Sequence, residues 1–152
     1  MSERFTDFER FADEVARLRG RMRALFTETR AESGLPEMEL TVLTAVVNAA
    51  TAPTVAQIGR SLGHPRQVVQ RAANRLAELG LAAFAENPDH KRASLIVATK
   101  AGRTLKAADH VRAQAVTRAV MTRIEGPAFA EAADRMHAIR TEIEAYLRER
   151  EA

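Results

Sequence analysis

The stretch that runs from Thr54 to Leu79 reads TVAQIGRSLGHPRQVVQRAANRLAEL, and it decides the fold that we expect. Thr54 followed by Gln57 three residues later is a capping-box pattern, which predicts a short helix ending at Gly63. Pro65 suits the start of a second helix, because the first turn of a helix needs no backbone N–H donor. The inward-facing residues of that helix are Val69, Ala72, Ala73, Leu76 and Leu79. A short helix, a tight glycine turn and a longer helix together predict a helix-turn-helix.

The residues after this motif carry the pattern of a β-hairpin. Residues 81–85 and 93–99 are suited to two strands, and residues 87–89 between them (Asn-Pro-Asp) are typical of a turn. The basic tip of the hairpin consists of His90, Lys91 and Arg92. We therefore expect a two-stranded wing beside the second helix.

Both ends of the chain carry apolar residues at alternating spacings of three and four, which is the pattern of long helices with one apolar face. The N-terminal stripe is Phe5, Phe8, Phe11, Val15, Leu18, Met22 and Leu25. The C-terminal stripe is Phe129, Ala132, Met136, Ile139, Ile143 and Tyr146, and it follows a helix over about 99–124 and a break at Gly126-Pro127. These stripes are explained either by a bundle within the chain or by a dimer interface. A short middle lobe leaves them little to cover, which favours the dimer.

The expected fold class is therefore mainly α with a small β-hairpin wing, in which long N- and C-terminal dimerisation helices flank a winged helix-turn-helix lobe. We expect one domain over residues 1–152, with the lobe at 36–103 and the dimerisation helices at 4–32 and 100–149. Within the lobe, Pro36 precedes a helix that should run to about Ala50. The candidate dimer-interface residues are Phe5, Phe8, Phe11, Val15, Met136, Ile139, Ile143, Tyr146 and Leu147.

The charge is distributed unevenly along the chain. Residues 54–103 carry eight Lys or Arg against three Asp or Glu, a net charge of +5, whereas the whole chain of 152 residues has +3. A basic middle between slightly acidic flanks is what a phosphate backbone attracts. There is no cysteine, and the four histidines lack zinc-ligand spacing, so we expect no metal and no cofactor. Without a signal-peptide or membrane-span pattern, we expect a cytoplasmic protein that does not bind a membrane.

The exposed face of the second helix carries the side chains that we expect to enter the major groove of double-stranded DNA. Arginine can pair with guanine through two hydrogen bonds, and glutamine or asparagine can do so with adenine. The candidates for this contact are Arg66, Gln67, Gln70, Arg71 and Asn74. The candidates for the DNA backbone and the wing are Thr54, Arg75, His90, Lys91 and Arg92. The alternative is a solvated helix face, but the absence of any acid from Gly63 to Ala77 favours DNA contact.

The ordered series of these motifs resembles the MarR family of bacterial transcriptional regulators. The resemblance covers residues 54–63, Arg66 to Arg71, residues 74–76, Gly80-Leu81 and the run Asn87-Pro-Asp-His-Lys-Arg-Ala93. It implies a ligand-responsive homodimer, usually a repressor, that reads a pseudo-palindromic operator. It also implies an effector crevice for small aromatic or lipophilic compounds. Met22, Phe26, Met38 and Thr44 either touch this crevice or, as the sequence favours, belong to the ordinary core.

The chain departs from the family pattern at several positions. Pro65 stands where the family often has a capping serine, and His90 stands where a wing aspartate usually braces an arginine, with Asp89 adjacent as a substitute. Phe84, Ala85 and Ala98 indicate a hairpin that is packed differently from the family's.

The sequence therefore predicts a sequence-specific transcriptional regulator. The alternative is a winged-helix module that binds a protein or small molecule and has only incidental DNA affinity. An enzyme is not expected, because no catalytic triad, metal spacing or phosphate loop can be recognised.

Overall fold

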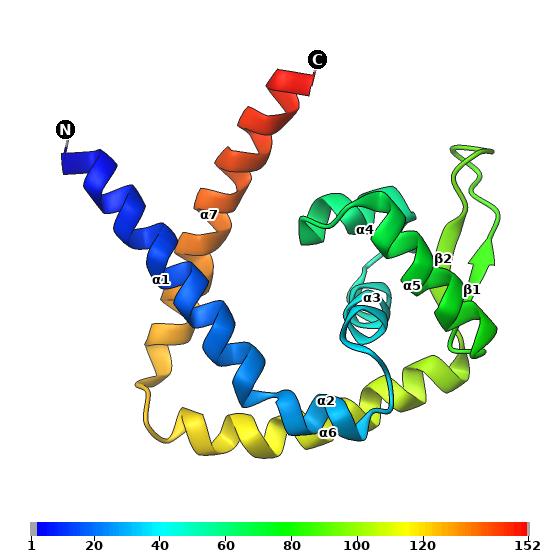
Figure 1. Cartoon of the computed structure of the whole chain (residues 1–152), viewed down its shortest axis with the longest axis horizontal. Helices are drawn as coiled ribbons and strands as arrows, with labels where there is room; N and C mark the ends of the chain where they lie inside the picture. The colour runs from blue at the N-terminus through cyan, green and yellow to red at the C-terminus, as the bar shows by residue number, and fades with distance from the viewer. Residues whose placement is uncertain (1–2, 152) are drawn as a thin grey trace. The chain divides into compact units, whose positions relative to one another are not determined.

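The computed structural model describes residues 3–151, so the ends of the expected domain, residues 1, 2 and 152, lie outside it. The chain divides into two compact units, Met1–Ala113 and Gln114–Ala152. Figure 1 follows the elements in chain order, and they confirm a mainly helical fold with one hairpin. The elements are α1 (Glu3–Leu25), α2 (Thr27–Glu32), α3 (Glu37–Asn48), α4 (Val55–Leu62), α5 (Arg66–Glu78), β1 (Ala82–Ala85), β2 (Leu95–Ala98), α6 (Lys100–Met121) and α7 (Gly126–Glu151).

The helix-turn-helix consists of α4 and α5, and the start and end of α4 and the start of α5 lie where the sequence predicts. The Oγ1 of Thr54 accepts the backbone N–H of Gln57 at 3.2 Å, and the Oε1 of Gln57 accepts the N–H of Thr54 at 2.7 Å. Gly63 ends α4 in the left-handed conformation with φ of 66°, which glycine adopts without strain. Pro65 precedes α5 and gives it no side-chain cap.

The core of the lobe lies where α3, α4, α5 and the hairpin meet. Helix α5 packs against both α3 and α4, the apolar faces of the three helices share one core, and β2 contributes Ile96. Leu79 is the exception among the predicted inward residues: it follows the last turn of α5 and is 44% exposed. The most buried large side chains are Val42, Leu43, Val69, Leu76 and Ile96.

The predicted hairpin forms, and its two strands pair antiparallel from Ala82 opposite Ala98 to Ala85 opposite Leu95. Each strand is shorter than expected. The side-chain amide of Asn87 explains the early end, because its Nδ2 donates to the carbonyl of Ala93 at 2.8 Å and closes the loop there. The backbone N–H of Ile96 also donates to the carbonyl of Pro53 at 2.8 Å, which ties β2 to the start of α4.

The start of α6 is pinned to the corner between α5 and β1. Thr99 donates its hydroxyl to the carbonyl of Gly80 at 2.7 Å and its backbone N–H to the carbonyl of Leu81 at 3.1 Å. The same hydroxyl accepts the N–H of Gly102 at 3.1 Å and so caps the helix. A Cβ added to Gly102 would lie 2.0 Å from the carbonyl oxygen of Leu81. Only glycine allows this close approach.

Two helix boundaries differ from the sequence prediction. Helix α6 ends at Met121, and Gly126-Pro127 opens α7 instead of forming the break. A proline fits there because the backbone N–H groups in the first turn of a helix have no acceptor within the helix in any case. At the other end of the chain, α1 stops at Leu25 and a separate short α2 follows, although no glycine or proline marks the junction.

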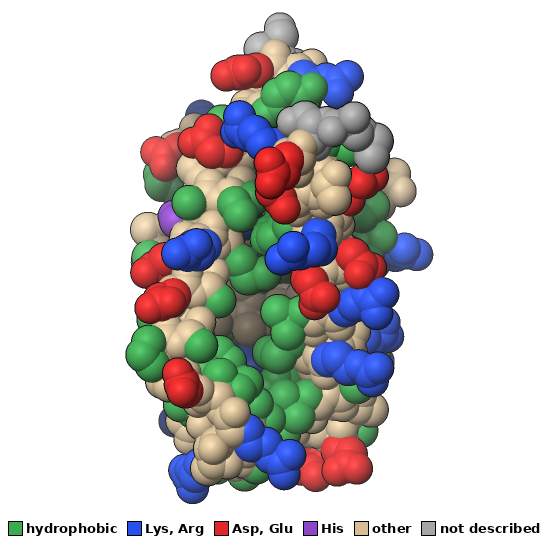
Figure 2. All heavy atoms as spheres, turned by 90° about the vertical axis from the view of Figure 1, so that its left-hand side faces the viewer, with side chains coloured by type: hydrophobic (Ala, Val, Ile, Leu, Met, Phe, Trp, Pro, Cys, Tyr) green, Lys and Arg blue, Asp and Glu red, His purple; other side chains and the backbone are tan. Residues whose placement is uncertain are grey.

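The long helices α1 and α7 expose much of their apolar surface. No residue of α1 is buried, and none is buried in α7 from Gly126 to Arg150. The exposed fraction is 56% for Phe8 and 57% for Tyr146. Figure 2 shows hydrophobic side chains exposed on one face of the molecule. Phe5, Ile139, Ile143 and Leu147 are also exposed, whereas Phe11, Val15 and Met136 are half-buried.

Candidate nucleic-acid interface

The outward face of α5 brings together four of the five side chains predicted for the major groove. Arg66, Gln67, Gln70 and Arg71 line one shallow depression on this helix. Their spacing of three and four residues places them on one side, while Val69, Ala72, Ala73 and Leu76 bury the other side. Hydrogen-bonding groups and apolar packing are thus separated on opposite faces of the helix.

The guanidinium groups in this depression are not neutralised by the protein. Within residues 3–151, neither Arg66 nor Arg71 makes a hydrogen bond or an ion pair through its side chain. No acid occurs between Gly63 and Ala77 to approach them along the helix. Their donors are therefore available to a ligand with acceptor groups.

The fifth predicted residue, Asn74, is engaged within the helix. Gln70 donates from Nε2 to the Oδ1 of Asn74 at 2.9 Å. In the next residue, Arg75, the Nη1 lies 3.0 Å from the Oε2 of Glu78, in an exposed ion pair. Arg75 therefore differs from Arg66 and Arg71, since part of its charge is already balanced.

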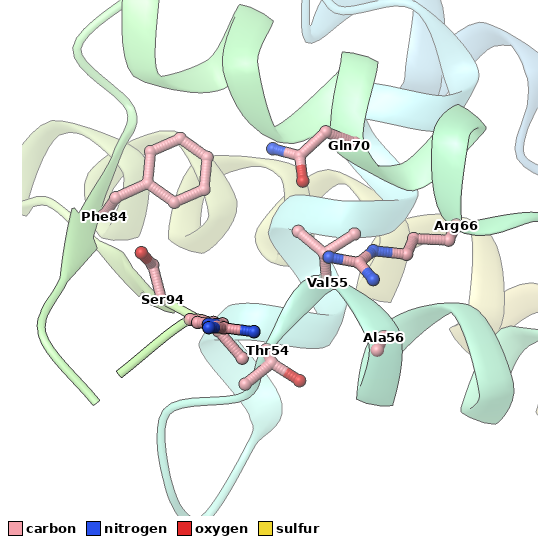
Figure 3. Close-up of a pocket in the computed structure, with 9 residues that line it drawn as sticks. Thr54, Val55, Ala56, Arg66, Gln70, Phe84 and Ser94 are labelled. Carbon is pink, nitrogen blue, oxygen red and sulfur yellow. The ribbon is translucent and has the colours of Figure 1, made fainter. Parts of the chain in front are cut away.

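A cleft of about 310 Å³ separates α5 from the hairpin (Figure 3). Arg66 and Gln70 enter it from α5, and Phe84 and Ser94 enter it from the hairpin. Thr54 at the start of α4 forms part of its wall, together with Val55, Ala56, Arg92 and Ala93. The cleft thus joins four predicted site residues, Thr54, Arg66, Gln70 and Arg92, on the surface between motif and wing.

The remaining wing residues lie apart from this cleft. Lys91 lines a separate hollow beside the hairpin, which also includes Phe84 and Pro88. His90 is exposed. Its backbone N–H donates to the carbonyl of Asn87, and its carbonyl accepts the N–H of Ala93. Asp89 makes no ion pair in the described part of the chain, and its N–H binds the Oδ1 of Asn87 at 3.0 Å.

Sequence reasoning missed Phe84 and Ser94 as parts of the surface. They reach the cleft through the folding back of the hairpin, and no local pattern signals this. The pairing of Gln70 with Asn74 could have been predicted from the sequence, because amide side chains four residues apart on a helix can bond to each other.

A second cavity, of about 320 Å³, lies between α2, α3 and α6 within the first compact unit. Lys106 and Asp109 line it as an ion pair of 2.5 Å, with side-chain exposures of 17% and 7%. Of the residues expected at an effector crevice, Phe26 and Thr44 line this cavity, whereas Met38 packs against the core and Met22 is exposed. The other lining residues are Thr29, Arg30, Leu40, Thr41 and Ala113.

The described part of the chain contains neither a metal-binding cluster nor a membrane-spanning helix. Among residues 3–151, no group of three or more His, Asp or Glu side chains is arranged to hold a metal ion. None of the helices in the same part of the chain combines the length and the apolar character needed to cross a membrane.

A capped short helix, a second helix with an outward basic face and a hairpin anchored beside both define a winged helix-turn-helix protein. Residues 33–93 match the model of the MarR family. The fold is shared with the CouR protein of Rhodococcus jostii RHA1 bound to p-coumaroyl-CoA, with a TM-score of 0.74 and 20% identity over 85% of this chain and 90% of that one. It is also shared with a MarR-family transcriptional regulator of Rhodococcus sp. RHA1, with a TM-score of 0.73 and 21% identity over 91% and 96% of the two chains.

A curated relative is more similar in sequence. The uncharacterized protein Rv2011c of Mycobacterium tuberculosis is 37% identical over 97 residues, which make up 64% of this chain and 66% of that protein. The segment over residues 33–93 is therefore similar to the MarR family, and the fold of the chain is that of solved MarR-family proteins.

Proposed function

We propose that the chain regulates transcription by binding double-stranded DNA in a sequence-specific manner. The observation that carries this proposal is the depression on α5, where Arg66, Gln67, Gln70 and Arg71 present their side chains without an acidic neighbour. These are the side-chain types that pair with base edges in the major groove. The proposed role is binding and release, without catalysis of a reaction, in the cytoplasm.

In the proposed complex, α5 lies in the major groove and the N-terminal half of the helix reaches the bases. Arg66 and Arg71 pair with guanine, and Gln67 and Gln70 with adenine. The DNA backbone and the neighbouring minor groove are contacted by Thr54, Arg75, His90, Lys91 and Arg92. Such contacts set the register of the protein on the duplex and add affinity that depends on salt.

We further propose that two copies of the chain bind as a homodimer. The support is the apolar surface of α1 and α7, because a helix of 26 residues with no buried side chain up to Arg150 gains little from packing in one chain. A second copy would cover Phe5, Phe8, Ile139, Ile143 and their neighbours on these stripes. A dimer with two α5 helices matches a pseudo-palindromic operator, since its two half-sites share the symmetry of the protein.

The cavity between α2, α3 and α6 is the proposed site of a small effector that changes DNA affinity. Its wall combines the phenyl ring of Phe26 and the side chain of Leu40 with the buried Lys106–Asp109 pair, which suits a compound with both apolar and polar parts. CouR, which shares the fold, holds p-coumaroyl-CoA. The expected outcome of effector binding is release of a repressor from its operator.

The test is selection of bound duplexes from a random pool by the full chain. We expect enrichment of a palindrome, and binding to it should weaken steeply as salt rises. Arg66→Ala and Arg71→Ala should each lose about 1 to 3 kcal/mol of discrimination between the selected duplex and its substituted forms. Arg118→Ala, which removes the same charge from an exposed position on α6, is the matched control. Equal affinity for all duplexes would refute sequence-specific regulation.

A further inference from the structure

Gln70 occupies the middle of the proposed DNA-reading surface. It is half-buried, and it lines both the depression on α5 and the cleft beside the hairpin. Its carboxamide is held by Asn74, which accepts the Nε2–H at 2.9 Å. We propose that Asn74 is a positioning residue that makes Gln70 read adenine and reject guanine, an inference that rests on the DNA binding proposed above.

The argument starts from the hydrogen-bonding groups of a carboxamide. Gln70 has one oxygen acceptor and two N–H donors on the same nitrogen. One N–H is committed to Asn74, so the oxygen and the second N–H remain for a ligand. An acceptor beside a donor matches the major-groove edge of adenine, which offers the N6 amino group and N7.

Guanine presents a different edge to the same side chain. Its N7 and O6 are both acceptors, so full pairing requires two donors. A free glutamine could turn both of its N–H groups toward guanine, but Gln70 has only one left. If the carboxamide of Gln70 turned over, its oxygen would face the Oδ1 of Asn74, and two acceptors cannot bond. With its Oδ1 toward Gln70, as in this structure, Asn74 favours one orientation of the Gln70 carboxamide.

Within residues 3–151, the side chain of Gln70 bonds to Asn74 and to no other residue. Phe84 lies across the cleft from Gln70 in Figure 3 and is 41% exposed, and its ring has no hydrogen-bonding group to divert the carboxamide. Arg66, one turn earlier on α5, lines the same cleft without a hydrogen bond to Gln70. The remaining oxygen and N–H of Gln70 thus face the space that a base would enter.

The experiment uses the duplex that the wild-type full chain selects from a random pool. Every base pair of one half-site is replaced in turn, and dissociation constants are measured for the wild type and for Gln70→Ala, Asn74→Ala and Asn74→Asp. In the wild type we expect one position where adenine is preferred over guanine by about 5- to 150-fold, which Gln70→Ala abolishes. Asn74→Ala should also abolish this preference while affinity for the guanine-substituted duplex is retained.

Asn74→Asp separates positioning from a direct contact. A carboxylate is only an acceptor, so it holds the carboxamide of Gln70 in the same orientation. This variant should bind all duplexes more weakly because of its added negative charge, yet keep the adenine preference. Asn48→Ala, at the exposed end of α3, is the control for the loss of an asparagine and should leave the profile unchanged.

The outcomes distinguish the two proposals. A wild type without any preferred duplex overturns the proposed function and this inference with it. A selective wild type whose adenine preference survives Asn74→Ala overturns the inference alone. So does an equal loss of affinity for every duplex in Asn74→Ala, because that result assigns Asn74 a general role in binding or folding.

Discussion

Replacement of Gly102 by alanine should destabilise the protein, although alanine is the better helix former. The added Cβ would lie 2.0 Å from the carbonyl oxygen of Leu81 and 3.3 Å from the Cδ1 of Leu43. That carbonyl cannot move freely, because it accepts the N–H of Thr99 at 3.1 Å. Relief of the overlap costs about 1 to 3 kcal/mol, and the weakened hydrogen bond costs about 1 kcal/mol more.

The preference of a helix for alanine over glycine offsets about 1 kcal/mol of this cost. The net loss of unfolding free energy in Gly102→Ala is therefore about 1 to 3 kcal/mol. Gly20→Ala is the matched control, because Gly20 is also helical and a Cβ there meets nothing within 4 Å. That variant should be stabilised by up to about 1 kcal/mol.

The assay is thermal and denaturant unfolding of the three proteins at one protein concentration, because the Tm of a dimer depends on concentration. For a chain of this size, the Tm should fall by about 2 to 12 °C in Gly102→Ala and rise by up to about 4 °C in Gly20→Ala. A Gly102→Ala protein with the Tm of the wild type or higher would show that α6 does not approach the corner as closely as described.

Three further predictions concern charges and the dimer. Glu78→Gln should release Arg75 to a phosphate and steepen the dependence of log K on log salt by about 0.9, and an unchanged slope in DNA-binding titrations would contradict this. Asp109→Ala should lower the unfolding free energy by up to about 3 kcal/mol because it leaves the half-buried Lys106 unpaired. Asp13→Ala, which breaks an exposed pair, should cost less than about 1 kcal/mol, and similar losses in denaturant titrations would refute the difference. Ile143→Glu should yield a helical monomer in light scattering and circular dichroism, because a charge would be buried in the proposed interface; a persistent dimer would argue against that interface.

The helix-turn-helix was predictable because its signals are local. The capping box of Thr54 and Gln57 and the left-handed turn at Gly63 each depend on a few consecutive residues, and both form as expected. The similarity to the MarR family and the fold class were accessible for the same reason. The stripe of α5 also identified its buried face, apart from Leu79 just beyond the last turn.

The parts that the sequence did not reveal depend on residues far apart in the chain. The end of α1 at Leu25 has no glycine or proline to mark it. Phe84 joins Gln70 in the cleft only because the hairpin folds back beside α5. Lys106 and Asp109 are three residues apart and could have been paired by spacing, but their burial results from α2 and α3 covering them.

The two-sided character of α5 has a consequence for how such a protein can diverge. Its stability depends on Val69, Ala72, Ala73 and Leu76, whereas the outward side chains make no contribution to the core. Substitutions at exposed positions away from caps and ion pairs usually change stability by no more than about 0.5 kcal/mol. A library randomised at Arg66, Gln67 and Arg71 should therefore consist largely of folded proteins. On the proposed function, duplicated copies of this chain can acquire new DNA sites one side chain at a time without passing through unfolded intermediates.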